Sequence, residues 1–254
     1  MPEGAGRDSR TLEGKRVIVT GASRGIGRAI AIGCAEAGAL VGVNFHRCEE
    51  DARDVANCIG SRAVLLRFDV GDATAVSAAF EAFERRAGGI DALVNNAGII
   101  RPSLLASAPD QDIDEVVRTN LFGTIVCTRA ALRPMLTQRH GVILNVGSVA
   151  AERPVRGQTV YAATKGAIEA FTRAVAVEYG RKGIRCHCLR PGPVDTQMLA
   201  PTKALAGDAV LERIPLRRCV TPEEVADLAV FLLSDRAGTI TGATHTIDGG
   251  FIAG

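Results

Sequence analysis

Aromatic residues are scarce in this sequence, and neither sign of charge dominates. Of 254 residues none is tryptophan, two are tyrosine and eight are phenylalanine. Thirty Lys and Arg stand against twenty-eight Asp and Glu, and the basic residues do not gather into a run. Proteins that bind nucleic acids are usually more basic, and those that bind single strands use stacking aromatics. We therefore expect no nucleic-acid partner.

Long hydrophobic runs and paired cysteines are also missing. The longest apolar runs are only as long as a β-strand, far below the ~18–20 residues of a membrane-spanning helix, so we expect no membrane partner. The seven cysteines form no C-x-x-C pair, and neither an N-x-S/T acceptor nor an apolar leader is present. These absences favour a reduced, cytoplasmic setting.

The sequence offers one candidate for metal binding, the tripeptide Cys186-His187-Cys188. Neighbouring side chains in an extended segment point to opposite faces, so these three cannot converge on one ion. We interpret them as strand packing and expect no metal site.

One theme repeats along the chain: a short β-branched apolar run, a turn rich in Gly or Asn, and an Ala-rich helical stretch. The apolar runs predict seven strands, at residues 16–20, 40–45, 63–67, 92–95, 141–146, 184–189 and 244–247. Helices are expected near residues 25–37, 49–59, 73–87, 111–137, 160–182 and 222–233. Because parallel strands need such crossovers, the pattern predicts one doubly wound α/β domain of the Rossmann type, with about seven parallel strands and helices on both faces.

We expect residues 13–254 to form this single domain, and residues 1–12, which are polar and contain glycine, to form a mobile tail. The one long irregular stretch, residues 192–220, contains three prolines. Such an excursion from a compact domain is usually a lid or specificity loop, so we predict that it contacts the substrate.

A glycine-rich turn follows the first predicted strand. Gly21, Gly25 and Gly27 allow a sharp turn and a close backbone approach to a pyrophosphate, and the helix that follows offers free N–H groups. The spacing is G-x-x-x-G-x-G rather than the more general G-x-G-x-x-G, and in isolation it also fits an ordinary tight turn.

Further motifs make a family resemblance specific. In chain order they are Thr20-Gly21-x-x-x-Gly25-x-Gly27, Asn95-Asn96-Ala97-Gly98, Asn120, Ser148, Tyr161-x-x-x-Lys165 and Pro191-Gly192. This order and spacing resemble the short-chain dehydrogenase/reductase family over nearly the whole chain. Within that family the sequence is similar to the 3-oxoacyl-[acyl-carrier-protein] reductases, and it departs from them at residues 153–156 and from Asp195 onward.

The resemblance implies four catalytic residues: Asn120, Ser148, Tyr161 and Lys165. Tyr161 is the expected proton donor to a ketone oxygen, and Lys165 is expected to lower the phenol pKa and to bind the nicotinamide ribose. A phenol with a pKa of roughly 10 needs a nearby cation to act near neutral pH, and residues four apart share one helix face. Ser148 is expected to hold the substrate carbonyl, and Asn120 a water molecule that relays protons between Lys165 and solvent.

The resemblance also implies a dinucleotide site along the expected strand ends. Its residues are Gly21, Ser23, Arg24, Gly25, Ile26, Gly27, Asn44, Arg47, Asp69, Val70, Asn96, Ala97, Gly98, Tyr161, Lys165, Pro191, Gly192, Val194 and Thr196. An NAD-specific site would have a carboxylate at the end of the second strand, but no acid occurs there before Glu49. Arg24 and Arg47 offer positive charge instead, which predicts NADP(H) over NAD(H).

Together these features predict an NADPH-dependent oxidoreductase that reduces a ketone to a secondary alcohol, with a 3-oxoacyl thioester or a related keto compound as substrate. Two alternatives stay open: an alcohol, sugar or polyketide-type dehydrogenase of the same family, and a non-catalytic NADP-sensing protein. If acyl carrier protein delivers the substrate, we expect Arg139 and Lys182 to line the rim of the cleft. The resemblance also implies a homotetramer that pairs the helices containing Asn120 and Tyr161.

Overall fold

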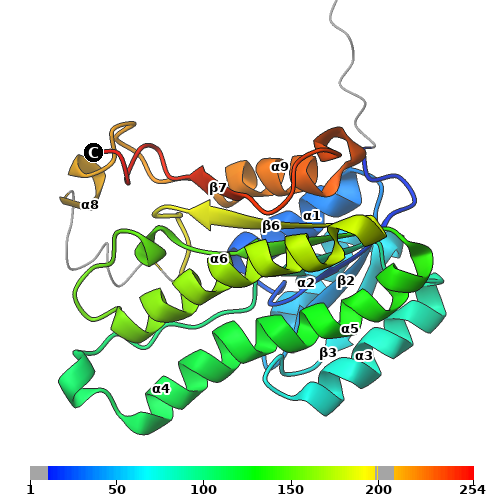
Figure 1. The fold of residues 1–254 in the computed structure, drawn as a ribbon, viewed down its shortest axis with the longest axis horizontal. Helices are drawn as coiled ribbons and strands as arrows, with labels where there is room; N and C mark the ends of the chain where they lie inside the picture. Colours follow the sequence, from blue (N-terminus) through cyan, green and yellow to red (C-terminus); the bar gives the residue numbers. More distant parts are fainter. Residues whose placement is uncertain (1–10, 198, 200–208) are drawn as a thin grey trace, which may run out of the picture.

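Seven parallel strands form one sheet between two layers of helices (Figure 1). The computed structural model describes residues 11–197, 199 and 209–254. In space the strands follow the order β3-β2-β1-β4-β5-β6-β7. Their bounds are β1 Arg16–Val19, β2 Leu40–Phe45, β3 Ala63–Arg67, β4 Ala92–Asn95, β5 Gly141–Val146, β6 Ile184–Pro191 and β7 Thr244–Ile247. The predicted doubly wound sheet is confirmed.

The strand bounds differ from the predicted ones at two ends. β1 ends one residue early because Thr20 already turns toward β4, where its N–H donates to Val94 O at 2.9 Å. β6 runs two residues further, to Pro191, which pairs in register with Ile247 of β7. Proline has no N–H to give to a ladder, so it is tolerated at the end of a strand.

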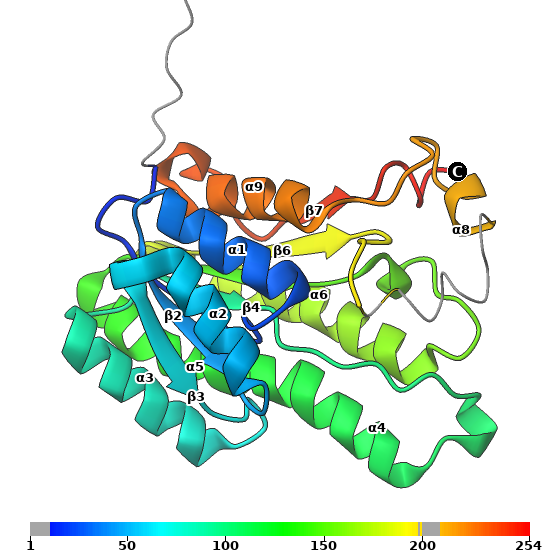
Figure 2. The same cartoon turned by 180° about the vertical axis from the view of Figure 1, so that it is seen from behind.

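Helices α1, α2 and α9 cover one face of the sheet (Figure 2), and α3, α5 and α6 cover the other (Figure 1). Each layer encloses its own hydrophobic core against the sheet. In the described part of the chain no helix is both long and apolar enough to cross a membrane. The helix bounds are α1 Gly25–Glu36, α2 Glu49–Ile59, α3 Ala73–Ala87, α4 Asp110–Val117, α5 Gly123–Gln138, α6 Thr159–Tyr179, α8 Ala209–Glu212 and α9 Pro222–Leu233.

The helix predicted over residues 111–137 is present, but it is not α-helical throughout. A π-helical turn, Arg118–Phe122, separates α4 from α5, and Asn120 lies within it, fully buried. The Thr124 hydroxyl donates to Asn120 O at 2.7 Å. Such wide turns are rare, and many lie at functional sites. Helix propensity alone gives no sign of it.

Two parts of the predicted domain organisation, the N-terminal tail and the loop over residues 192–220, lie partly outside the described residues. Residues 1–10 of the expected tail lie there, whereas Leu12 is buried and its N–H donates to Ala37 O at 2.9 Å. In the expected loop over residues 192–220, position 198 and residues 200–208 also lie outside. The described base of that loop is closed by a bridge between Val194 and Val220. The division into tail and domain stays a prediction.

The Cys186-His187-Cys188 segment lies in β6, and its side chains alternate as expected. Cys186 packs in the core beneath α6, whereas the His187 ring lies 5.5 Å from that of His245 on β7, centroid to centroid. Arg185 Nη1 lies 2.7 Å from His187 Nε2, so that nitrogen accepts and the ring proton is on Nδ1. Burial, and then the Arg185 charge, lower the pKa of His187 from 6.5 to about 3.

This buried imidazole makes stability depend on pH. Below about pH 6.5 the unfolded chain takes up a proton on His187 that the folded protein excludes until about pH 3, so stability falls as the pH falls through this window. Between pH 6.5 and 5 the loss is about 2 kcal/mol. Urea unfolding at pH 7, 6 and 5 should show this loss in the wild type and a flatter dependence in His187→Gln.

Asn57→Gln is the control, because Asn57 is exposed and its side chain does not titrate. It should keep the wild-type dependence. An unchanged slope in His187→Gln would contradict the assignment.

Candidate active site

The four predicted catalytic residues come from three segments that meet at the carboxyl-terminal edge of the sheet. Ser148 follows β5, Tyr161 and Lys165 lie on α6, and Asn120 lies in the π-helical turn. Ligands of doubly wound sheets bind at this edge. The structure therefore brings together residues that are up to 45 positions apart in the chain.

Ser148 and Tyr161 form a hydrogen-bonded pair. Ser148 begins the short 3₁₀ turn Val149–Ala151, and its Oγ accepts from the Ala150 N–H at 3.1 Å. Burial raises the pKa of Tyr161, and the hydrogen bond with Ser148 lowers it in part. The pair therefore holds a protonated phenol next to a half-buried hydroxyl at neutral pH.

Lys165 lies beneath the Tyr161 ring. Its Nζ is 5.6 Å from the ring centroid and donates to Val146 O at 2.7 Å. The residue is only 4% exposed, and burial lowers the pKa of the amine to about 8. The lowering of the phenol pKa by Lys165 stays a prediction, because burial has the larger effect on Tyr161 here.

Asn120 ties two parts of the site together. Its Oδ1 accepts from the Ile99 N–H at 2.8 Å, and its Nδ2 donates to Ile99 O at 2.9 Å and to Thr164 Oγ1 at 3.2 Å. The Thr164 hydroxyl donates to Tyr161 O at 2.7 Å. The amide of Asn120 thus fixes the segment after β4 against α6, and its predicted part in a water relay stays a prediction.

The glycine turn has the geometry of an anion site. Gly21 and Gly25 have φ of 61° and 55°, which L side chains rarely adopt. A Cβ at Gly27 would lie 2.3 Å from Asn96 Nδ2 and from Gly21 O, so only glycine fits there. No side chain caps the start of α1 at Arg24, which leaves backbone N–H groups and a partial positive charge facing outward.

Thr20, which the sequence reasoning did not single out as a site residue by itself, braces this turn. Its Oγ1 accepts from the Asn96 and Ala97 N–H groups, each at 3.0 Å, and donates to Val94 O at 3.2 Å. Asn96 Nδ2 donates to Thr20 O and Gly21 O at 2.9 and 3.0 Å. The only signal in the sequence is the hydroxyl that directly precedes the glycine turn.

Two predicted cofactor contacts have buried side chains. Asn44 Oδ1 accepts from the Gly21 N–H at 2.9 Å, and its Nδ2 donates to backbone carbonyls at the end of β3 and just beyond it, at 3.2 and 3.1 Å. The Val70 side chain lies in the core, within 3 Å of where a Cβ at Gly123 would be. These two residues can offer mainly backbone atoms to a ligand.

The remaining predicted contacts lie around the crevice. Asp69 Oδ1 accepts from the Gly71 N–H at 2.9 Å. A Cβ at Gly98 would lie 3.6 Å from Lys165 Nζ, and one at Gly25 would lie 3.5 Å from Thr196 Cγ2. Thr196 therefore brings the end of β6 at Pro191, and the segment after it with Gly192 and Val194, next to the glycine turn. Ser23 and Ile26 are half-buried in that turn.

Arg24 and Arg47 are both exposed. Within the described residues neither forms an ion pair or a side-chain hydrogen bond. Their guanidinium groups are available to a ligand at this edge.

The prediction that Arg139 and Lys182 line the cleft is wrong for this protomer. Arg139 caps the end of α5 just before β5, and Lys182 precedes β6. Both therefore lie at the amino-terminal edge of the sheet, about 20 Å of strand from Ser148.

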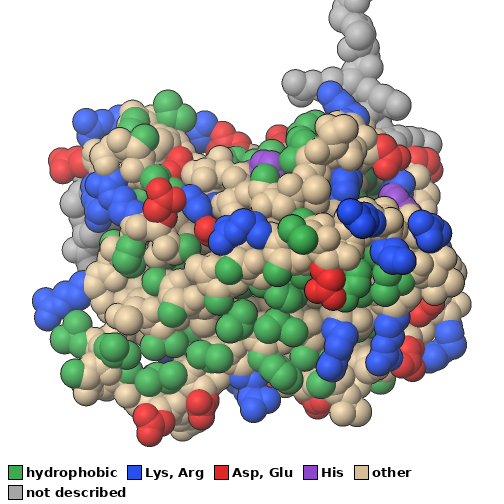
Figure 3. Space-filling model, viewed as in Figure 1, with side chains coloured by type: hydrophobic (Ala, Val, Ile, Leu, Met, Phe, Trp, Pro, Cys, Tyr) green, Lys and Arg blue, Asp and Glu red, His purple; other side chains and the backbone are tan. Residues whose placement is uncertain are grey.

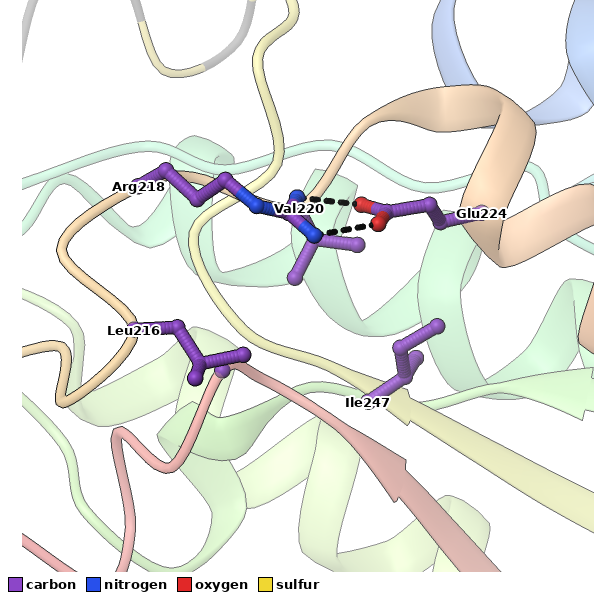
Figure 4. Close-up of a pocket in the computed structure, with 6 residues that line it drawn as sticks. Leu216, Arg218, Val220, Glu224 and Ile247 are labelled. Atoms are coloured by element: carbon purple, nitrogen blue, oxygen red, sulfur yellow. Dashed lines mark hydrogen bonds and ion pairs between the residues drawn. The ribbon is translucent and has the colours of Figure 1, made fainter.

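A small pocket lies beside the base of the substrate loop (Figure 4). It encloses about 80 Å³, and Arg218 and Glu224 close one side through two hydrogen bonds of 2.8 and 2.6 Å. Leu216, Val220 and Ile247 give it an apolar wall. Since it contains none of the four predicted catalytic residues, it is not the candidate active site.

Comparison with known proteins agrees with this geometry. A family model described as Enoyl-(Acyl carrier protein) reductase matches residues 21–252. The 3-oxoacyl-[acyl-carrier-protein] reductase FabG of Chlamydia muridarum is 41% identical over 245 residues, which cover 94% of this chain and 98% of that protein. The corresponding reductase of Escherichia coli is 36% identical over 242 residues, with coverage of 94% and 98%.

Two solved structures from Burkholderia cenocepacia are close in fold. A short chain dehydrogenase in complex with NADP has a TM-score of 0.89 and 36% identity, and the match covers 95% of this chain and 99% of that one. A gluconate 5-dehydrogenase in complex with NADP and tartrate has a TM-score of 0.90 and 36% identity, with coverage of 97% and 99%.

Proposed function

Because this chain belongs to the short-chain dehydrogenase/reductase family, we propose that it reduces the ketone of a 3-oxoacyl thioester to a secondary alcohol with NADPH. It is an oxidoreductase that uses a nicotinamide dinucleotide. The observation that carries the proposal is the Ser148–Tyr161 pair, held over the buried amine of Lys165 at the edge where the glycine turn lies.

The residues present fit a dinucleotide. The uncapped start of α1 suits a pyrophosphate, and the crevice between the glycine turn and Gly98 leads to Lys165. When bound, the nicotinamide supplies a hydride to the carbonyl carbon. Tyr161 gives its phenolic proton to the carbonyl oxygen while Ser148 donates a hydrogen bond to that oxygen, so the two groups stabilise the charge that develops there.

A second candidate is a sugar-acid or polyol dehydrogenase. It is favoured by the 36% identity to a gluconate 5-dehydrogenase, which equals the identity to the Escherichia coli reductase. A non-catalytic NADP sensor fits less well, because such a protein has no need of a Ser148–Tyr161 pair beside the buried amine of Lys165. Delivery by acyl carrier protein and a cytoplasmic location stay part of the proposal.

The test is a steady-state screen that follows NADPH absorbance with acetoacetyl thioesters, free and carrier-linked, and with simple ketones and keto-sugar acids. The highest kcat/KM is expected with a thioester. A preference for keto-sugar acids would support the second candidate.

Tyr161→Phe removes only the transferable proton. We expect kcat to fall by ~10²–10⁴-fold while NADPH affinity stays within about twofold, since general acid catalysis contributes this much. Stopped-flow reduction and NADPH fluorescence titration measure the two quantities. A variant that keeps more than half of the wild-type rate, with chemistry limiting, would remove Tyr161 from the role.

Preference for NADPH is proposed to rest on Arg24 and Arg47. Both guanidinium groups are available, and charge-assisted hydrogen bonds to a 2′-phosphate are stronger than neutral ones. We expect the double variant Arg24→Gln/Arg47→Gln to raise KM for NADPH by about ten- to a hundredfold and to leave KM for NADH nearly unchanged.

Arg62→Gln is the matched control, because Arg62 is equally exposed but precedes β3 at the opposite edge. It should change neither constant. A wild-type kcat/KM that is higher with NADH than with NADPH would overturn the assignment.

A homotetramer is proposed from two unpartnered features. Hydrophobic side chains gather over α4, α5 and α6 (Figure 3), and they include Phe122, Ile125 and Val177, the last 85% exposed. β7 is an edge strand with one free side. Apolar patches of this kind usually mark protein interfaces.

Light scattering at micromolar concentration should give four times the 26.6 kDa mass of one chain. Ile125→Glu, which places a charge on the helical patch, should halve that mass. A wild-type monomer would contradict the proposal.

A further inference from the structure

Phe251 forms a contact with two arginines from distant parts of the chain. Arg153 Cζ lies 5.4 Å from the centroid of the Phe251 ring, and Arg213 Cζ lies 5.1 Å from it. The ring itself is only 6% exposed. We call these three residues the Phe251 clasp. Arg153 follows the catalytic Ser148 turn, Arg213 follows α8, and Phe251 follows β7.

The clasp shares a buried cluster with the turn that begins with Ser148. Phe251 forms a buried cluster with Val149 and Ile214, separate from the two cores of the sheet. Val149 is the residue after Ser148, and its carbonyl accepts from the Arg153 N–H at 2.7 Å. Arg153 Nη1 donates to Phe251 O at 2.5 Å. The clasp is therefore tied to the turn in two ways: through the backbone hydrogen bond from Arg153 to Val149, and through the cluster that Phe251 shares with Val149.

Phe251 is itself held in a fixed position. The Asp248 carboxylate accepts from the Gly250 N–H at 2.8 Å and from the Ile252 N–H at 2.9 Å, one on each side of Phe251. A Cβ at Gly250, where φ is 91°, would lie 2.8 Å from Pro215 Cγ. The backbone on both sides of the ring is therefore fixed, and the ring stays in the cluster that contains Val149.

We propose that Phe251, clasped by Arg153 and Arg213, is a positioning residue that holds the Ser148 hydroxyl against Tyr161. The 3₁₀ turn that carries Ser148 is three residues long, and Val149 is its apolar anchor. If Val149 loses its packing, the turn can shift and the hydrogen bond between Ser148 Oγ and the Tyr161 hydroxyl is lost. This inference rests on the proposed function, because it deepens the role of the same catalytic pair.

The clasp has a consequence for the Tyr161 phenol that a purely structural role would lack. The Ser148 hydrogen bond lowers the phenol pKa against the effect of burial. The charged group that faces the ring is Lys165, and Val146 O anchors it independently of the clasp. Loss of the clasp should therefore raise the pKa of Tyr161 while Lys165 stays in place.

Phe251→Ala should lower kcat for ketone reduction about tenfold, the effect of one side-chain hydrogen bond, and leave KM for NADPH unchanged. In the reverse reaction the pH at which alcohol oxidation reaches half of its maximum rate should rise. Phe251→Leu, which keeps an apolar side chain on Val149, should restore most of kcat.

Phe80→Ala is the matched control. Phe80 is 2% exposed on α3 and lies in the core beneath α3, α5 and α6, outside the cluster of Val149, Ile214 and Phe251, so its loss should cost stability but leave the pH profile unchanged. If Phe251→Ala does not fold, Arg153→Gln removes the contact of the guanidinium with the Phe251 ring and its hydrogen bond to Phe251 O. This variant should shift the pH profile in the same direction. An unshifted profile in the folded variants would overturn the proposal.

A readout without turnover separates this proposal from the proposed function. The chain has two tyrosines and no tryptophan, so in Tyr179→Phe the ultraviolet absorbance of tyrosinate reports Tyr161 alone. Phe251→Ala in that background should raise the titration midpoint, whereas Phe80→Ala should not. An inactive wild type with this shift would overturn only the proposed function. An active wild type without the shift would overturn only the clasp.

Discussion

The close approach of two turns, after β1 and after β4, is the constraint on which the rest of the site depends. At Gly27 even a methyl group would lie 2.3 Å from Asn96 Nδ2 and from Gly21 O. Asn96 and the Thr20 hydroxyl then lock the two turns together through the backbone. Because the strand order reverses between β1 and β4, a crevice opens where the start of α1 presents its free N–H groups. Backbone geometry thus fixes the anion site before any charged side chain contributes.

Buried amides extend this order from the crevice to the catalytic helix. Asn95 Nδ2 donates to Asn145 Oδ1 at 2.8 Å, and Asn145 Nδ2 donates to the Thr172 hydroxyl of α6 at 2.9 Å. Asn120 makes the second link, through Thr164. Buried polar groups are costly unless they are paired, so each amide specifies one arrangement of sheet and helix. The position of Tyr161 follows from these hydrogen bonds.

The sheet, and the meeting of Asn120, Ser148, Tyr161 and Lys165 at one edge of it, were predictable because their signals are local or rest on recognised spacing. The π-helical turn was not, since it depends on hydrogen bonds between Asn120 and Ile99, 21 residues apart. The prediction that Arg139 lines the cleft was avoidable. Arg139 directly precedes the predicted strand at residues 141–146, and this alone places it at the amino-terminal edge of the sheet. The contact of Arg153 with Phe251 spans 98 residues and has no local signal at all.

The same difference between local and long-range signals explains why relatives with different activities resemble this chain to similar degrees, with 36% to 41% identity. The 36% identity to a 3-oxoacyl-[acyl-carrier-protein] reductase and to a gluconate 5-dehydrogenase is consistent with shared residues that serve the sheet, the dinucleotide and the proton donor. The surroundings of Ser148 are built instead by segments joined only in the folded protein: the turn after Ser148, the stretch around Ile214 and the residues after β7. Selectivity in such a site depends on how these segments pack on one another, as Val149, Ile214 and Phe251 do here, and overall identity does not measure that packing.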